Sequence, residues 1–92
     1  MDYRTRIRNV RQDRDFNQAQ IGDVIQKSQQ GYSHIENGRA ELKIDDLVLL
    51  CKFYDLSADY LIGLHDFPVS YRNVIDAHRP VDPPGGPTKG KQ

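Results

Sequence analysis

The chain has 92 residues, of which 37% are hydrophobic and 28% are charged, and its formal net charge is zero. This length predicts one domain with a small core, because a chain of this size buries only about 60–65% of its unfolded surface. Cys51 is the single cysteine, which excludes an intramolecular disulfide. No apolar segment has the length of a signal peptide or a membrane span, so we expect a cytoplasmic protein without membrane contact.

Charge is distributed unevenly along the chain. Residues 1–43 carry eight basic and six acidic side chains, whereas residues 44–66 carry one basic and five acidic side chains. Residues 67–92 carry four basic and two acidic side chains. The molecule is therefore polarised, and its zero net charge does not exclude nucleic acid as a partner.

The first predicted helix spans residues 3–14, because Ile7 and Val10 lie at helical spacing and share one face. Phe16 follows it and is expected to cover the core. Three arginines are expected to form a solvated outer face of this helix: Arg4, Arg6 and Arg8. One of them could contact a DNA backbone.

Two short helices joined by a tight turn are predicted over residues 18–25 and 28–36. Asn17 and Ser28 suit the N-cap of each helix, because their side-chain oxygens accept bonds from unpaired backbone amides. Gly38 suits the end of the second helix, since glycine readily adopts the left-handed conformation.

The second of these helices exposes amide side chains near its start. Tyr32 and Ile35 are expected to face inward, which leaves four polar side chains outward: Gln29, Gln30, Ser33 and His34. Glutamine can form two hydrogen bonds with one adenine, and a helix fits the major groove of DNA. The pattern predicts a helix that reads bases, although His34 could contact a base or a phosphate, or simply be exposed.

A fourth helix is predicted over residues 45–54 and a short fifth helix, capped by Ser57, up to residue 62. The fourth helix is expected to bury an apolar stripe: Leu47, Val48, Leu50, Cys51 and Tyr54. Residues 70–78 could form a sixth helix. The segment 79–92 is rich in proline and glycine and is expected to be disordered.

Residues 4–64 resemble the phage repressor/Cro-type helix-turn-helix family, also called XRE-like regulators. The matching pieces are RIRNVRQDRDFNQAQIG and SHIENGRAELKIDDLVLLCKFYDLSADYLIGL, in which the I-E-N-G block and the D-Y-L-I-G block stand at the family's distance. The resemblance implies an all-α, five-helix, lambda-repressor-like DNA-binding domain over residues 1–66, with its helix-turn-helix unit at 18–37. It also implies a homodimer on a near-palindromic operator.

The resemblance assigns roles to particular residues. Gln29, Gln30 and His34 match positions that contact bases, and Ser33 lies on the same strip. Four residues match positions that contact phosphates or lie in the loop that often meets the DNA backbone: Gln18, Asn37, Arg39 and Lys43. For two of them a purely structural role is the alternative, since Gln18 could simply complete the first turn of its helix and Asn37 could simply end the following one. Arg11 and Glu36 match a partly buried structural ion pair.

Three residues depart from the family pattern. Gln26 stands where the turn normally has glycine, and a non-glycine residue in the left-handed region costs about 1 kcal/mol. Gly31 lies within the third helix, where it costs about 1 kcal/mol relative to alanine. Lys27 replaces an apolar residue after the turn. We expect a reading unit of reduced rigidity, or one that DNA orders further.

The predicted function is that of a sequence-specific DNA-binding regulator of transcription, and within that class a repressor. The alternative is a protein-interaction adaptor or an antitoxin-type partner with the same fold, which the zero net charge would suit. No zinc site is expected, since His34, His65 and His78 lack the spacing of zinc ligands. We also expect no other metal, no cofactor, no small-molecule ligand and no catalytic activity. Six apolar residues are candidates for the dimer interface, or for packing within the monomer: Leu64, Phe67, Val69, Tyr71, Val74 and Ile75.

Overall fold

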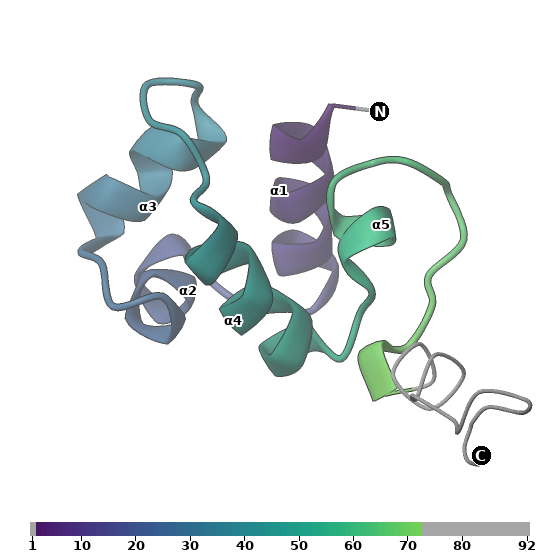
Figure 1. Ribbon diagram of the computed structural model, residues 1–92. Coiled ribbons are helices and arrows are strands. Elements are labelled where there is room, and N and C mark those ends of the chain that lie inside the picture. The colour runs from purple at the N-terminus through teal and green to yellow at the C-terminus, as the bar shows by residue number, and fades with distance from the viewer. Residues whose placement is uncertain (1, 73–92) are drawn as a thin grey trace, which may run out of the picture.

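The computed structural model describes residues 2–72, and within them the regular secondary structure is all α-helix, as the sequence predicts. Its five helices are α1 (Tyr3–Asp13), α2 (Gln18–Val24), α3 (Gln29–Glu36), α4 (Ile44–Tyr54) and α5 (Ala58–Leu61). In Figure 1, α2 and α3 lie on one side of the molecule and α5 lies on the other, with α1 and α4 between them. The short helices thus surround a core to which every element contributes.

Three of the helices begin at the caps that the sequence predicts. The Asn17 side-chain oxygen accepts from the Gln20 backbone amide at 2.8 Å, and the Asn17 backbone amide donates to the Gln20 side-chain oxygen at the same distance. The Ser28 hydroxyl caps α3 by accepting from the Gly31 amide at 3.0 Å, and Ser57 caps α5 in the same way. Each cap satisfies an amide that has no partner within its own helix.

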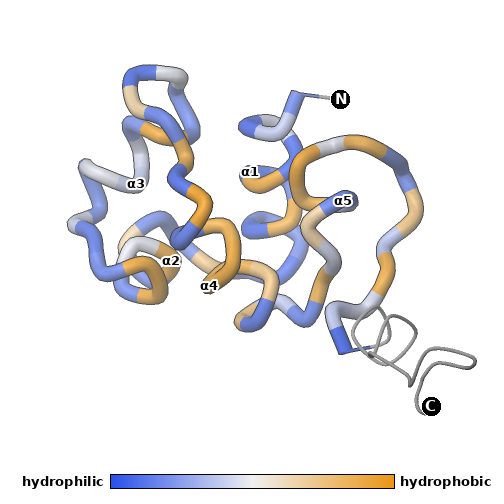
Figure 2. The backbone as a smooth tube through the Cα atoms, in the orientation of Figure 1, coloured by the Kyte–Doolittle hydropathy of each residue, from blue (hydrophilic) through white to orange (hydrophobic). Residues whose placement is uncertain are grey.

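The core is built from aliphatic side chains around two buried tyrosines. Tyr32 and Tyr54 have almost no exposed surface, and Cys51 is buried beside them as a small core residue. Burial raises the pKa of the Cys51 thiol. Figure 2 shows hydrophobic positions along α1, α2 and α4, and all three helices contribute residues to the buried cluster. Such a core leaves the polar face of α3 free to face solvent.

Val48 is not a core residue, and the prediction that α4 buries it was wrong. Its surface is 41% exposed, whereas Leu47, Leu50, Cys51 and Tyr54 are all buried. These four residues occupy positions i, i+3, i+4 and i+7, which form one stripe along the helix. Val48 follows Leu47 directly, so its side chain is rotated by about 100° around the helix axis from Leu47 and lies off the buried stripe.

Arg6 is not on an outer face of α1, and this prediction was also wrong. Only 4% of its surface is exposed. Its guanidinium donates to the carbonyl oxygens of Tyr60 and His65 at 2.6 and 3.0 Å, and it pairs with Asp66 at 2.9 Å. The segment that follows α5 returns along α1 and covers Arg6, which fixes that segment in place.

The sixth predicted helix lies mostly outside the described residues. Tyr71 and Arg72 are helical, and residues 73–92 are not described. Asp55 holds the start of this segment, because its carboxylate accepts from the Ser70 hydroxyl at 2.9 Å and from the Arg72 amide at 3.1 Å. These bonds lower the pKa of Asp55. Val74, Ile75 and the tail over 79–92 remain predictions.

Candidate nucleic-acid interface

The turn between α2 and α3 brings the two helices into close contact. The Lys27 amide donates to the Gly22 carbonyl at 2.8 Å, and Gln26 has a positive φ of 59°. A Cβ atom at Gly22 would lie 2.8 Å from the Lys27 carbonyl oxygen, so only glycine leaves room for this turn. The left-handed Gln26 confirms the strained turn that the sequence predicts.

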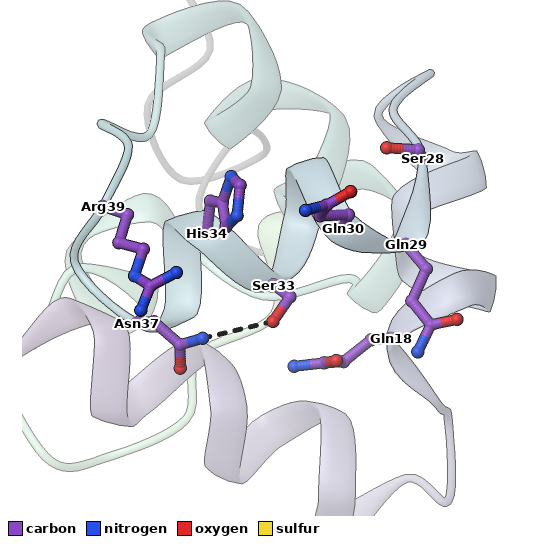
Figure 3. A pocket seen from close by; sticks show the side chains of 8 residues that line it. All are labelled: Gln18, Ser28, Gln29, Gln30, Ser33, His34, Asn37 and Arg39. Carbon is purple, nitrogen blue, oxygen red and sulfur yellow. Dashed lines mark hydrogen bonds between the residues drawn. The ribbon is translucent and has the colours of Figure 1, made fainter.

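The turn places the outer face of α3 beside the start of α2, and an open groove of about 530 Å³ lies between them. Figure 3 shows the side chains that line this groove, which come from α2, the turn before α3, α3 itself and the loop after it. They are Gln18, Ser28, Gln29, Gln30, Ser33, His34, Asn37 and Arg39. The fold therefore gathers seven of the eight residues that the sequence nominates for DNA contact.

Lys43 is the nominated residue that the groove does not include. It lines a second hollow of about 290 Å³ on the other side of His34, together with Lys27 and Glu41. Its backbone forms the N-cap of α4, and its side chain makes no cap bond there. Any contact of Lys43 with a ligand in the groove would have to come from this neighbouring hollow.

Gln29 and Gln30 are exposed at the first turn of α3. Within the described residues neither amide group makes a hydrogen bond, so its donors and acceptor face solvent. Ser33 and His34 lie one turn further along and are half-buried. The Asn37 amide donates to the Ser33 hydroxyl at 3.2 Å, as Figure 3 shows, and this bond limits the freedom of both side chains.

Glu36 links the groove to the core. Its buried carboxylate accepts from Arg11 Nε at 2.8 Å and from Arg11 Nη2 at 3.1 Å, and it also accepts from Gln18 Nε2 at 3.3 Å. Burial alone would raise the pKa of Glu36, but the bonds from Arg11 and Gln18 outweigh this effect and lower it. The geometry is that of a two-pronged buried ion pair, with Gln18 held at its edge.

Tyr32 is the other group near this carboxylate. Its hydroxyl is buried and makes no hydrogen bond of good geometry within the described residues. Burial and the nearby charge of Glu36 raise the pKa of Tyr32 far above its usual range. The raised pKa keeps the Tyr32 hydroxyl neutral near pH 7, as suits a buried core residue.

Two roles near the groove were not predicted from the sequence. Ser28 was assigned only as a cap, yet its side chain also lines the groove, which its place directly before Gln29 could have suggested. Lys27 pairs with the buried carboxylate of Asp46 at 3.6 Å and so ties the turn to α4. The ion pair with Asp46 of α4 thus explains how a lysine can replace the usual apolar residue at this position.

The region that forms the groove is similar in sequence to known proteins. Residues 7–61 match the helix-turn-helix family, a span that includes α2, α3 and the groove between them. The chain belongs to the XRE-type helix-turn-helix family. The matched region ends with α5, and it contains every residue that lines the groove.

A curated relative in Bacillus subtilis (strain 168) is the uncharacterized HTH-type transcriptional regulator YobD. It is 32% identical over 66 residues, which are 72% of this chain and 59% of the relative. The chain thus spans about 59% of the length of the curated relative that it matches. No solved structure matches the chain.

None of the helices within residues 2–72 has the length and apolar character needed to cross a membrane. No group of three or more His, Cys, Asp or Glu residues there is placed to hold a metal ion.

Proposed function

We propose that the chain is a sequence-specific DNA-binding regulator of transcription, acting as a repressor, which inserts α3 into the major groove as a homodimer. The observation that carries this proposal is the pair of exposed, unbonded amides of Gln29 and Gln30 at the start of α3, beside a polar groove. Membership of the helix-turn-helix family and the name of the bacterial relative support it.

The proposed base contacts come from one face of α3. Gln29 and Gln30 each offer a donor and an acceptor, which is what bidentate pairing with adenine requires. Ser33 and His34 follow one turn later, so a groove-docked helix would place them over neighbouring base pairs. Each good bidentate contact contributes about 1–3 kcal/mol of discrimination against a wrong base.

The proposed phosphate contacts surround that face. Gln18 gives one N–H to Glu36 and keeps a second for a phosphate oxygen. Asn37 and Arg39 border the groove at the other end of α3, and Lys43 is a more distant fourth contact. These contacts would fix the register of the helix, whereas the bases would supply the specificity.

The proposed homodimer follows from the size of the module. One small domain reads only a few base pairs, and two copies on half-sites one helical turn apart supply the missing affinity. We propose that residues 1–66 form the DNA-binding domain and that residues 67–78 take part in dimerisation. Leu64 and Phe67 support this arrangement because they are 70% and 77% exposed and thus lie open to a second copy.

A second candidate function is protein interaction, as in an adaptor or an antitoxin-type partner. It is favoured by the apolar side chains that α4 leaves at least partly exposed: Ile44, Val48, Leu49 and Phe53. Patches of this kind commonly mark protein contacts. In that case the groove beside α3 would not need to bind DNA.

Duplex binding separates the two candidates. We expect the purified chain to bind a random-sequence duplex at low salt, with log affinity falling linearly against log salt as phosphate contacts displace counterions. Selection from a pool of random duplexes should then enrich two related half-sites about one helical turn apart. A folded protein that binds no duplex at low salt would overturn the DNA-binding proposal and favour the adaptor.

A further inference from the structure

Arg4 holds the chain on both sides of Arg39. Its Nε donates to the carbonyl oxygen of Ile35 in the last turn of α3 at 3.0 Å, and its Nη2 donates to the carbonyl oxygen of Ala40 at 3.2 Å. The first bond satisfies a carbonyl at the C-terminus of α3, where a positive charge is favourable. The two bonds join the end of the helix to the loop that follows it.

Arg4 also packs beside Gly38, the first residue of this loop. Gly38 has a φ of +83°, and a Cβ atom at Gly38 would lie 3.6 Å from Arg4 Nε. The guanidinium therefore lies directly against the glycine that ends α3. The guanidinium also lies over the ring of Tyr3, with Arg4 Cζ 4.6 Å from the ring centre.

Arg39 lies between the two anchored carbonyl groups. Its amide donates to the His34 carbonyl oxygen at 2.8 Å, and its exposed side chain lines the groove beside α3. Glu41, two residues further on, would repel phosphate, but its exposed carboxylate lies 3.8 Å from Arg4 Nη2. Arg4 thus bonds to the backbone on both sides of Arg39 and lies within ion-pair distance of the Glu41 carboxylate.

We propose that Arg4 is a positioning residue for DNA binding: it holds the 38–41 loop so that Arg39 meets the phosphate backbone. This inference rests on the proposed function, because it concerns the same groove. It replaces the expectation that Arg4 is a solvated side chain. Only an arginine can fill the role, since lysine lacks the planar fork that reaches both carbonyl oxygens.

The test is a salt titration of binding to a random-sequence duplex by four variants and the wild type. Arg4→Gln and Arg4→Lys should both weaken binding about tenfold at low salt, and each should make the log–log salt slope shallower by about one. Arg39→Gln should have the same effect. Arg4→Gln added to Arg39→Gln should then change affinity less than about twofold, because the contact that Arg4 positions is already absent.

The matched control is Arg8→Gln, which removes an arginine one turn along α1 that makes no hydrogen bond to the loop within the described residues. It should bind like the wild type. Hydrogen exchange of the Arg39 amide in the free protein should accelerate in both Arg4 variants and not in the control. The lysine variant keeps the charge, so it separates loss of the two carbonyl bonds from loss of the positive charge.

Three results would overturn the proposal. Wild-type affinity in Arg4→Gln would show that the loop needs no anchor, and full rescue by Arg4→Lys would show that charge alone matters. Independent, additive losses in the double variant would show that Arg4 acts without Arg39. A wild-type protein that binds no duplex would instead overturn the DNA-binding function itself, so the two failures are distinguishable.

Discussion

Gln18 and Glu36 are joined by a hydrogen bond of 3.3 Å from the Gln18 Nε2 to the Glu36 Oε1. The same carboxylate oxygen accepts from Arg11 Nη2 at 3.1 Å. A buried ion pair between α1 and α3 therefore also orients a side chain at the edge of the groove. A change at Glu36 should affect both the stability of the fold and the position of Gln18.

Glu36→Gln should destabilise the domain by about 3 kcal/mol, because it leaves the buried guanidinium of Arg11 without its counter-charge. Urea unfolding followed by circular dichroism measures this change. Glu41→Gln is the matched control, since Glu41 is exposed and should shift the free energy of unfolding by less than about 0.5 kcal/mol. Equal effects of the two substitutions would contradict the structural role of the Arg11–Glu36 pair.

Stability should depend on pH through Glu36. Because its pKa in the folded protein lies below the value of 4.5 typical of an unfolded chain, ionised Glu36 contributes stability that is complete above about pH 4.5. That contribution is lost as the pH falls through the lowered pKa. Urea unfolding between pH 7 and pH 2 should show a steeper acid loss in the wild type than in Glu36→Gln. Parallel pH profiles of the two proteins would contradict this prediction.

Gln29→Ala and Gln18→Ala should weaken DNA binding in different ways. Gln29→Ala removes a proposed base contact, so it should cost about 1–3 kcal/mol on the selected operator and little on random duplex. Gln18→Ala removes a proposed phosphate contact, so it should weaken both duplexes alike. Competition binding with the two duplexes measures the ratio of affinities. The same ratio in both variants would contradict the assignment.

Local sequence signals predict most of the fold and most of the groove. Asn17, Ser28 and Ser57 cap the helices that they were expected to cap, and the alternation of apolar and polar residues in α3 correctly turns Tyr32 inward and Gln29 outward. These features depend on residues within four positions of one another. Such relationships can be read along the chain without knowledge of the tertiary structure.

The features that the sequence did not predict depend on distant parts of the chain. Arg6 is buried because its partners, Tyr60 and His65, come from a segment more than fifty residues later. Arg4 likewise bonds to Ile35 and Ala40, which lie 31 and 36 residues later in the chain. Val48 was misassigned because α4 is apolar on several sides, so that hydrophobicity alone does not define its buried stripe.

Alanine substitutions at the two glycines of the helix-turn-helix unit should have opposite effects on stability. Gly22→Ala should destabilise the domain by about 1–3 kcal/mol, because its Cβ would lie 2.8 Å from the Lys27 carbonyl oxygen, a backbone atom. Gly31→Ala should stabilise it by up to about 1 kcal/mol through helix propensity. Its Cβ would meet the Ser28 hydroxyl at 3.3 Å, a side chain that can move slightly.

Thermal unfolding of the two variants measures this difference. A destabilised Gly31→Ala would show that the Ser28 cap cannot adjust, because the cap bond to the residue 31 amide would then be lost. A stable Gly22→Ala would contradict the close approach of the turn to α2. Gln26→Gly offers a third comparison, since glycine relieves the positive φ of 59° at that position.

Leu64 and Phe67 should control dimerisation and leave the monomer intact. Both side chains are largely exposed, so replacing both by serine should change the free energy of unfolding of the monomer by less than about 0.5 kcal/mol. Loss of their apolar surface should convert the proposed dimer into a monomer, as measured by analytical ultracentrifugation. Binding to a two-half-site operator should then weaken much more than binding to a single half-site.

Ile44→Ser is the matched control for this prediction. Ile44 is an equally exposed apolar residue, but it lies at the start of α4 and not in the segment after α5. Its substitution should leave the dimer unchanged if Leu64 and Phe67 form the interface. A dimer that persists in the double serine variant and dissociates in Ile44→Ser would place the interface on α4, because the exposed apolar residues of that helix would then be the ones that a second copy covers.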